Sequence, residues 1–252
     1  MAAETPATVV PPTTGERYGP LVHRRVHQGA ICWLIAVVEW IAANIVTQVG
    51  WDLKAGNPSY NLAHNYISDL GAVNCGTFAG RYICSPWHIV FDAATVVFGL
   101  LLILGTLLVV TAFPARSTRT IGLGLLVISS IGAIGVGLSP EDVNLAVHTA
   151  SATTAFAAGN IAIIVLGIAM FRDTRWSGYR AFSVICGLVG FVALILLATG
   201  AFKIAGFFSD WGAGGIERTI VAPVLLWAIL VSVHLLRIRS YAPRAMPRAS
   251  AG

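Results

Sequence analysis

Six apolar stretches constrain this 252-residue chain more than any other feature. Each is about twenty residues long, which is long for a soluble core helix and matches the hydrocarbon thickness of a bilayer. Backbone polar groups in lipid must bond within their own segment, so each stretch is predicted to be a helix. The predicted fold class is all-α, a bundle of six transmembrane helices, with spans at about Gly29–Gly50, Pro86–Phe113, Thr120–Leu138, Leu145–Phe171, Ala181–Ala205 and Ile220–Leu236.

The distribution of basic residues predicts the orientation of the bundle. Twelve of the sixteen Lys and Arg residues lie on one side of the six-span pattern. The other side holds only Lys54, Arg81, Lys203 and Arg218. Short loops rich in Lys and Arg stay in the cytoplasm, so both termini are predicted to be cytoplasmic. The basic residues are dispersed over short segments, so the net charge of +5 does not indicate a nucleic-acid partner, and membrane lipids are the expected partners.

The predicted domain organisation has three parts. Residues 1–20 form a cytoplasmic tail rich in Pro, Thr and Ala that we expect to be disordered. Residues 21–239 form the membrane domain, and residues 240–252 form a second cytoplasmic tail. The longest loop, 51–85, is predicted to be ordered and to carry a short amphipathic helix around Leu62–Leu70 that caps the outer face. The sequence makes no prediction of oligomeric state.

Cysteine placement agrees with this topology. Cys75 and Cys84 fall in the same predicted outer loop, where the compartment permits a disulfide. Cys32 and Cys186 fall within spans, where small buried thiols are common. We therefore expect a Cys75–Cys84 bridge.

Reactive side chains gather on the predicted outer side. His88 and Asp92 are four residues apart and share one helix face, either as an orienting hydrogen bond or as an acid–base pair. His148 is expected to be satisfied by a neighbouring polar group, or to act in a site. Glu141 and Asp142 are read as carboxylates at a helix start, because Ser139-Pro140, like Ser85-Pro86, is a typical helix-opening pair.

Arg218 and Asp69 are the expected centre of this outer cluster. Arg218, with Glu217, opens the last span and is predicted to pair with Asp69 or Asp142, or else to bind a phosphate or carboxylate headgroup. Asp69 is expected to point toward Arg218 or His88. The candidate ligand-binding residues are therefore Asp69, His88, Glu141, Asp142, His148, Glu217 and Arg218, and the candidate catalytic residues are His88, Asp92, His148 and Asp69.

Two further kinds of site are open to these residues. His64, His88 and His148 with nearby acids are sufficient for a zinc site with an open position, although the expected cofactor is none. Glu39 lies in the middle of the first span and Asn160 in the middle of the fourth. A carboxyl group at that depth is a candidate for proton-linked transport, or a protonated group bonded to an amide such as that of Asn160.

Several motifs carry a family resemblance. They are Asn65-Tyr66-Ile67-Ser68-Asp69-Leu70-Gly71, Cys75-Gly76, Cys84-Ser85-Pro86-Trp87-His88, Ser139-Pro140-Glu141-Asp142 with His148, Gly159-Asn160, and Gly215-Ile216-Glu217-Arg218. From about Gly29 to Leu236 the chain resembles the family called domain of unknown function 998. The resemblance implies a bacterial six-span inner-membrane protein and no established activity. A looser similarity, through Ser68-Asp69 and the six-span layout, is to Frag1/DRAM/Sfk1 membrane proteins.

Three functions follow as hypotheses. The first is an uncharacterised membrane protein that engages a lipid or small amphiphile from its outer side. The alternative is an outward-facing metal-dependent hydrolase of lipids or amides, and the third is proton-linked transport. Whether the chain is an enzyme is left open.

Overall fold

Six long helices dominate the computed structural model, which describes residues 14–203 and 210–238. Each is long and apolar enough to cross a membrane. They are α1 (Thr14–Leu53), α2 (His88–Val109), α3 (Ser117–Leu138), α4 (Leu145–Ala169), α5 (Tyr179–Thr199) and α7 (Gly212–Arg237). Short 3-10 helices η1 (Ser68–Gly71), η2 (Val110–Ala112), η3 (Thr174–Trp176) and η4 (Ala201–Lys203) lie between them, with two strands, β1 (Gly76–Phe78) and β2 (Arg81–Ile83). The predicted six-helix fold class is confirmed.

Each predicted span overlaps one of these helices, and the differences fall at the ends. The spans predicted to end at Phe113 and Ala205 are too long, since α2 ends at Val109 and α5 at Thr199. The helix α1 begins at Thr14, so the tail predicted over 1–20 is helical from residue 14 onward. The helix α7 begins at Gly212, eight residues before the predicted span, because the polar turn Glu217-Arg218 continues the helix. Residues 1–13, 204–209 and 239–252, which include the predicted C-terminal tail, lie outside the described residues.

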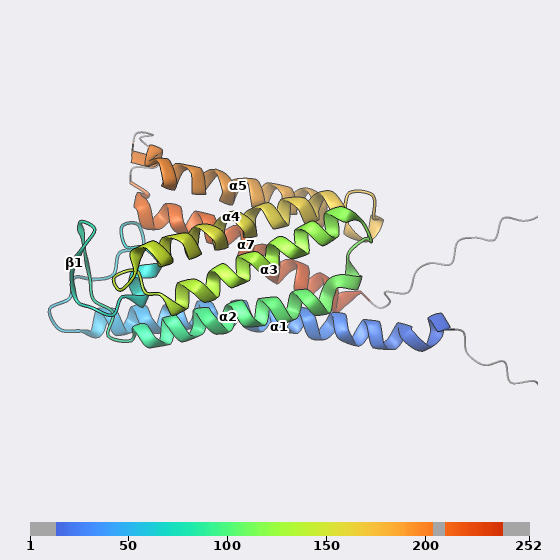
Figure 1. Ribbon diagram of the computed structural model, residues 1–252, viewed down its shortest axis with the longest axis horizontal. Coiled ribbons are helices and arrows are strands. Elements are labelled where there is room, and N and C mark those ends of the chain that lie inside the picture. Colours follow the sequence, from blue (N-terminus) through green and yellow to red (C-terminus); the bar gives the residue numbers. More distant parts are fainter. Residues whose placement is uncertain (1–13, 204–209, 239–252) are drawn as a thin grey trace, which may run out of the picture.

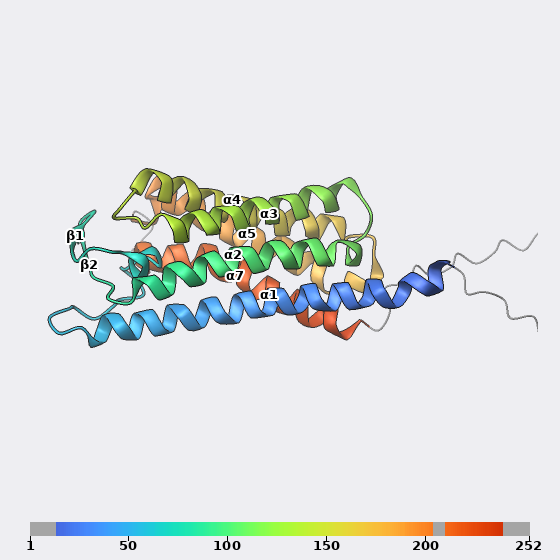
Figure 2. The same cartoon turned by 60° about the horizontal axis from the view of Figure 1, so that its bottom comes forward.

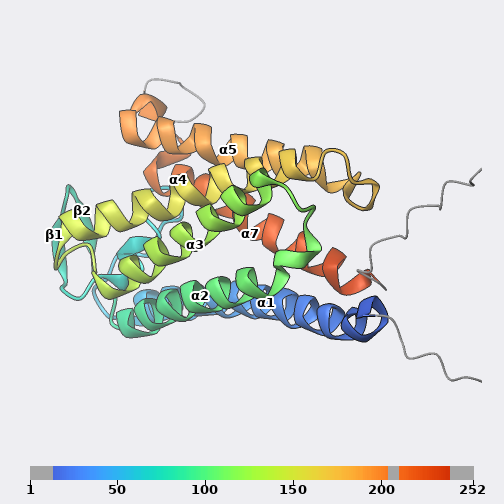
Figure 3. The same ribbon diagram turned by 45° about the vertical axis from the view of Figure 1, so that its right-hand side comes forward.

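The helices run alongside one another in a single bundle (Figures 1 and 2). Neighbours in sequence from α1 to α5 pack side by side, and α7 packs against α5 and α1, which closes the ring. The β1–β2 hairpin lies at one end, which we call the loop end. The start of α1 and the end of α7 lie at the other, the opposite end (Figures 1 and 3).

Glycines allow several of these helices to approach closely. A Cβ atom at Gly132 of α3 would lie 2.6 Å from the backbone nitrogen of Ala155 in α4. A Cβ atom at Gly187 of α5 would lie 2.5 Å from the carbonyl oxygen of Asn160. Lipid tails are as apolar as leucine, so membrane helices gain from such close packing rather than from hydrophobic burial.

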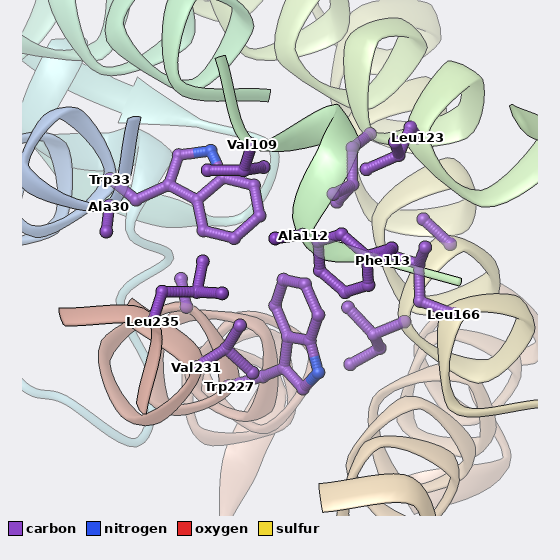
Figure 4. Close-up of a cluster of buried hydrophobic side chains, with 14 of the residues drawn as sticks. Ala30, Trp33, Val109, Ala112, Phe113, Leu123, Leu166, Trp227, Val231 and Leu235 are labelled. Carbon is purple, nitrogen blue, oxygen red and sulfur yellow. The ribbon is translucent and has the colours of Figure 1, made fainter. Parts of the chain in front are cut away.

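Aromatic and aliphatic side chains fill the bundle toward the opposite end. Trp33 of α1 and Trp227 of α7 have ring centroids 5.5 Å apart, and Figure 4 shows them pointing toward each other beside Phe113. The Phe113 ring stacks on Trp176 at 4.9 Å. We call this set, which also includes Leu166 and Val231, the apolar cluster.

The loop between α1 and α2 folds against the loop end as a structured cap. The strands β1 and β2 pair antiparallel, with Phe78 opposite Arg81. The two turn residues, Ala79 and Gly80, have φ values of 47° and 81°, as the tight turns favoured in hairpins require. The predicted Cys75–Cys84 disulfide is present and joins the two ends of the hairpin.

The predicted amphipathic helix at Leu62–Leu70 is wrong. The segment forms a turn followed by the short helix η1. Asn61 Oδ1 accepts hydrogen bonds from the backbone of Ala63 and His64, and Asp69 Oδ2 accepts one from the backbone of Tyr66. Side chains thus take backbone donors that a longer helix would have used, which is why Asn and Asp compete with helix formation.

The predicted serine caps are also wrong. The N-cap of α2 is Trp87, and Ser85 Oγ instead donates to the Leu70 carbonyl at 2.6 Å. Asn144 caps α4 by accepting a hydrogen bond from Val147 N. The segment Pro140–Val143 is therefore a turn that precedes the helix, and it presents Glu141 and Asp142 to the loop.

Candidate functional site

A buried ion network joins the loop to the α3–α4 connection. Arg81 Nε donates to both carboxylate oxygens of Asp69, at 2.7 and 3.0 Å. Its Nη2 lies 2.7 Å from Glu141 Oε1 and 2.6 Å from Asp69 Oδ1. Asp69 is 0% exposed and Glu141 is 5% exposed. Buried charges are tolerated when they are paired and hydrogen-bonded, as they are here.

The hairpin directs Arg81 into this network. Successive residues of a strand point to opposite faces, and along β2 Tyr82 is exposed while Ile83 is buried. Arg81 therefore shares the inward face with Ile83. Its guanidinium carbon lies 4.4 Å from the centre of the Tyr66 ring, which covers one side of the ion pair.

The electrostatics of the network follow from its excess of carboxylates. Burial by itself would lower the pKa of Arg81, but its hydrogen bond to Asp69 and the two acidic charges raise the pKa overall. Burial, together with the hydrogen bond and charge of Asp69, raises the pKa of Glu141 to about 8, against the opposing effect of Arg81. Two carboxylates beside one guanidinium cannot both ionise freely, so Glu141 holds its proton near neutral pH.

Two more contacts fix the loop on the same side. Ser68 Oγ donates to Glu141 Oε2 at 2.8 Å. Asp142 accepts from the backbone nitrogens of Val73 and Asn74, at 3.1 and 2.7 Å, and from Asn74 Nδ2. Burial would raise the pKa of Asp142, but these hydrogen bonds outweigh it and lower the pKa. The turn at Pro140–Val143 thus binds the loop through hydrogen bonds that Glu141 and Asp142 accept.

A second set of contacts fixes the loop to α7. Arg218 Nη1 donates to the carbonyls of Leu62 and Asn65, at 2.9 and 2.8 Å, and Nη2 donates to the Tyr60 hydroxyl at 2.6 Å. Burial raises the pKa of Tyr60 above its usual range, so the phenol stays neutral and donates onward to the Tyr66 carbonyl. The neighbouring Glu217 accepts a hydrogen bond from Ile67 N.

These contacts correct two predicted pairings. Asp69 pairs with Arg81 rather than with Arg218 or His88. Arg218 donates to backbone carbonyls and a phenol, and no ion pair from it to Asp69 or Asp142 is formed among the described residues. The physical reason is shape: the hairpin places Arg81 directly over Asp69, and the turn at Leu62–Asn65 presents its carbonyls to α7.

The three outer histidines have separate environments. His88 Nδ1 lies 3.2 Å from Asp92 Oδ2, as the spacing predicted. His148 Nδ1 lies 2.8 Å from the Ser139 carbonyl, and His64 is exposed beside the start of α7. Within residues 14–203 and 210–238, no three His, Cys, Asp or Glu side chains are grouped closely enough to hold a metal ion. The structure therefore does not assemble the ligand set of the zinc hypothesis.

A cavity of about 90 Å³ lies inside the bundle, beneath η1. Its walls are mostly apolar and come from α1, α2, α3, α4 and α7, with Phe91, Phe98, Leu102, Val136, Phe156 and Ile220 among them. The polar side chains Ser68, His148 and Glu217 line it, and Asn160 lines it deeper in the bundle. The hydroxyls of Thr95 and Ser129 also line it, and they donate to the carbonyls of Phe91 and Ala155. A second space of about 20 Å³ shares Phe98 and Leu102 with it and reaches Trp33 and Trp227 of the apolar cluster. Apolar walls with a few polar groups are typical of small-molecule sites.

The predicted membrane carboxyl, Glu39, stands apart from this cavity. Glu39 is half-buried on α1 and is absent from the cavity lining, which α1 reaches through Trp40. Asn160 Nδ2 donates to the carbonyls of Phe156 and Ile220, at 2.9 and 3.2 Å. Among the described residues, the predicted hydrogen bond between Glu39 and Asn160 is not formed.

Sequence reasoning missed Arg81 and Tyr60 as site residues. Arg81 had a usable signal, since it is the one arginine in the predicted outer loop and lies between the two cysteines. Tyr60 had none, because its role depends on a turn that brings its hydroxyl to Arg218.

Taken together, the six spans and the folded cap define a multi-pass membrane protein with a capped internal cavity. The family model described as "Protein of unknown function (DUF998)" matches residues 29–234. The chain belongs to this family, as the motifs at Asn65–Gly71 and Gly215–Arg218 indicated. Neither the comparison with curated proteins nor the comparison with solved structures finds a significant match.

Proposed function

We propose that this protein binds a lipid or small amphiphile in the cavity beneath its cap. The observation that carries the proposal is the cavity itself, whose walls are mostly apolar and which has Ser68, His148 and Glu217 near the loop end. Its other polar lining residues are Thr95, Ser129 and Asn160. An amphiphile matches this arrangement of apolar and polar walls. Its apolar chain would cover the apolar walls and exclude water from them, and its polar headgroup would contact the polar side chains.

The size of the cavity sets how much of the ligand it encloses. A volume of about 90 Å³ is smaller than a drug-sized site, for which roughly 300 Å³ is the lower end. The polar end and the first part of a chain fit this volume. The remainder of a longer chain extends between helices toward the apolar cluster, where the second space continues.

Orientation and location are part of the same proposal. The chain is placed in the cell inner membrane with the loop end facing outward and both termini in the cytoplasm. The basic-residue distribution supports this orientation, as does the disulfide, which persists in oxidising compartments. An introduced cysteine at Ser117, near the opposite end, is expected to resist impermeant thiol reagents in intact cells. Labelling there from outside would contradict the orientation.

Two other functions have less support. A metal-dependent hydrolase requires converging ligands, and His64, His88 and His148 lie in separate environments among the described residues. Proton-linked transport through Glu39 and Asn160 requires a polar path between them, and within the described part of the chain no hydrogen bond joins the two side chains.

Native mass spectrometry and lipid extraction of the purified full chain test the proposal. The wild type is expected to retain a bound amphiphile. Val221→Phe, which adds a ring to a cavity-lining position of α7, is expected to reduce the bound fraction at least about tenfold. Val97→Phe is the matched control, because Val97 is 43% exposed on the outside of α2. Equal retention by both variants, or an empty wild-type protein, would contradict ligand binding in this cavity.

A further inference from the structure

We infer that the ligand of this cavity carries a hydrogen-bond donor and no negative charge at its polar end, as a long-chain alcohol or amine does. This inference rests on the proposed function and names the chemical class that the same site accepts. Three observations carry it: the polar atoms that the cavity walls leave without partners, the commitment of the nearby guanidinium groups elsewhere, and the charge of the lining.

His148 contributes an acceptor. Its Nδ1 lies 2.8 Å from the Ser139 carbonyl oxygen, which can only accept, so Nδ1 carries the proton. The neutral ring then presents Nε2 as an acceptor, and no partner for Nε2 is found among the described residues. His148 is 6% exposed and lines the cavity, so this acceptor faces the bound molecule rather than bulk water.

Glu217 contributes a second polar group at the same end. One carboxyl oxygen, Oε2, accepts from Ile67 N, while within the described part of the chain Oε1 has no hydrogen-bond partner. Ser68 donates its own proton to Glu141, so its oxygen also remains available as an acceptor. A ligand hydroxyl satisfies such a set because it both donates and accepts, and an ammonium satisfies it because it donates and carries the complementary charge.

Anionic headgroups meet the opposite situation. They need cationic or N–H donors, and the cavity lining among the described residues includes Glu217 but no Lys or Arg. Arg81 is committed to Asp69 and Glu141, and Arg218 to three carbonyls and Tyr60. A carboxylate or phosphate here would therefore be desolvated beside another carboxyl group, which is strongly unfavourable.

A competition series on the unmodified full chain tests this class. The protein is placed in nanodiscs of uncharged lipid, and dodecanol, dodecylamine, dodecanoate and dodecyl phosphate compete with a fluorescent fatty alcohol. The four share one chain and differ in the polar end alone. Dodecanol and dodecylamine are expected to displace the probe at concentrations about tenfold lower than the two anions. Val221→Phe supplies the background from partition into the bilayer.

Two variants distinguish the alcohol from the amine and tie the preference to the named residues. Glu217→Gln keeps an oxygen for Ile67 N and removes the charge. It is therefore expected to weaken the binding of dodecylamine several-fold more than the binding of dodecanol. His148→Phe is expected to weaken the binding of dodecanol about tenfold, since one hydrogen bond is lost. The wild-type series does not depend on either variant folding.

The outcomes separate this inference from the proposed function. Equal or tighter binding of dodecanoate or dodecyl phosphate would overturn the inferred ligand class and leave binding in the cavity intact. Displacement by none of the four, with Val221→Phe indistinguishable from wild type, would overturn both.

Discussion

The two ends of the bundle are held together by different forces. At the opposite end the apolar cluster packs Trp33, Phe113, Trp176 and Trp227 without a charged side chain among its members. At the loop end, Asp69, Glu141 and Glu217 are all buried and are bonded to the loop. Apolar packing is non-directional, whereas ion pairs and hydrogen bonds fix atoms in place.

The difference indicates where positional accuracy matters. Burying a carboxyl group is costly, and replacing buried ion pairs by apolar residues is often neutral or stabilising. The loop end thus carries polar groups that stability alone does not require. The apolar cluster secures the bundle, and the loop end positions Ser68, His148 and Glu217 above the cavity.

Arg81→Ala is expected to produce the largest loss of stability, because it leaves Asp69 and Glu141 buried without their cation. Removing one partner of a buried pair costs about 3–5 kcal/mol. Reversible unfolding in detergent measures the change. Lys54→Ala, at an exposed lysine of the same loop, is the control and should lie close to wild type. Equal stabilities for both variants would show that the network does not hold the cap.

Removal of the disulfide, as Cys75→Ser with Cys84→Ser, is expected to cost about 2–3 kcal/mol, since it frees a short loop in the unfolded chain. The hairpin should also become accessible to protease, because Arg81 then lacks a fixed scaffold. Cys32→Ser, at a cysteine outside the bridge, is the control. Unchanged proteolysis of the hairpin in the double variant would be the contrary result.

Leu166→Ala tests the apolar cluster. The expected loss is about 2 kcal/mol, at the low end of the range for buried leucines, because lipid is as apolar as the interior it replaces. Leu100→Ala, 54% exposed on α2, should have little effect. Unfolding curves at several pH values sharpen the comparison: Leu166→Ala should shift them all equally, and a pH-dependent shift would contradict a purely apolar role.

The pH dependence that Glu141 confers distinguishes the loop end from the apolar cluster. Its pKa is raised in the folded protein from 4.5 to about 8. A group of this kind contributes stability that is fully present below pH 4.5 and is lost as the pH rises through about 8. Stability should therefore fall across this window in the wild type and fall less steeply in Glu141→Gln. Parallel pH profiles for the two proteins would refute the raised pKa.

The sequence predicted the features that depend on composition or local spacing. Hydropathy located the six spans, two cysteines in one loop located the bridge, and four-residue spacing located the His88–Asp92 pair. Each of these rests on residues that are close in sequence or on a property of whole segments.

The rest depends on how distant segments meet. Asp69 finds Arg81 because a two-residue turn sets the strand register, and a shift by one residue would turn the arginine outward. The expected helix does not form because the side chains of Asn61 and Asp69 accept hydrogen bonds from backbone N–H groups. The cavity is a space among five helices, and no single helix carries its signature.

The contacts of Arg218 with the loop determine which substitutions the loop can accept. Arg218 contacts the main-chain carbonyls of Leu62 and Asn65, and Gly215 N donates to that of Ala63. Every amino acid supplies the same backbone carbonyl, so these hydrogen bonds do not depend on the side chains at positions 62 and 63. Substitutions at these two positions are therefore expected to change the chemistry of the rim of the cap and to leave its attachment to α7 in place.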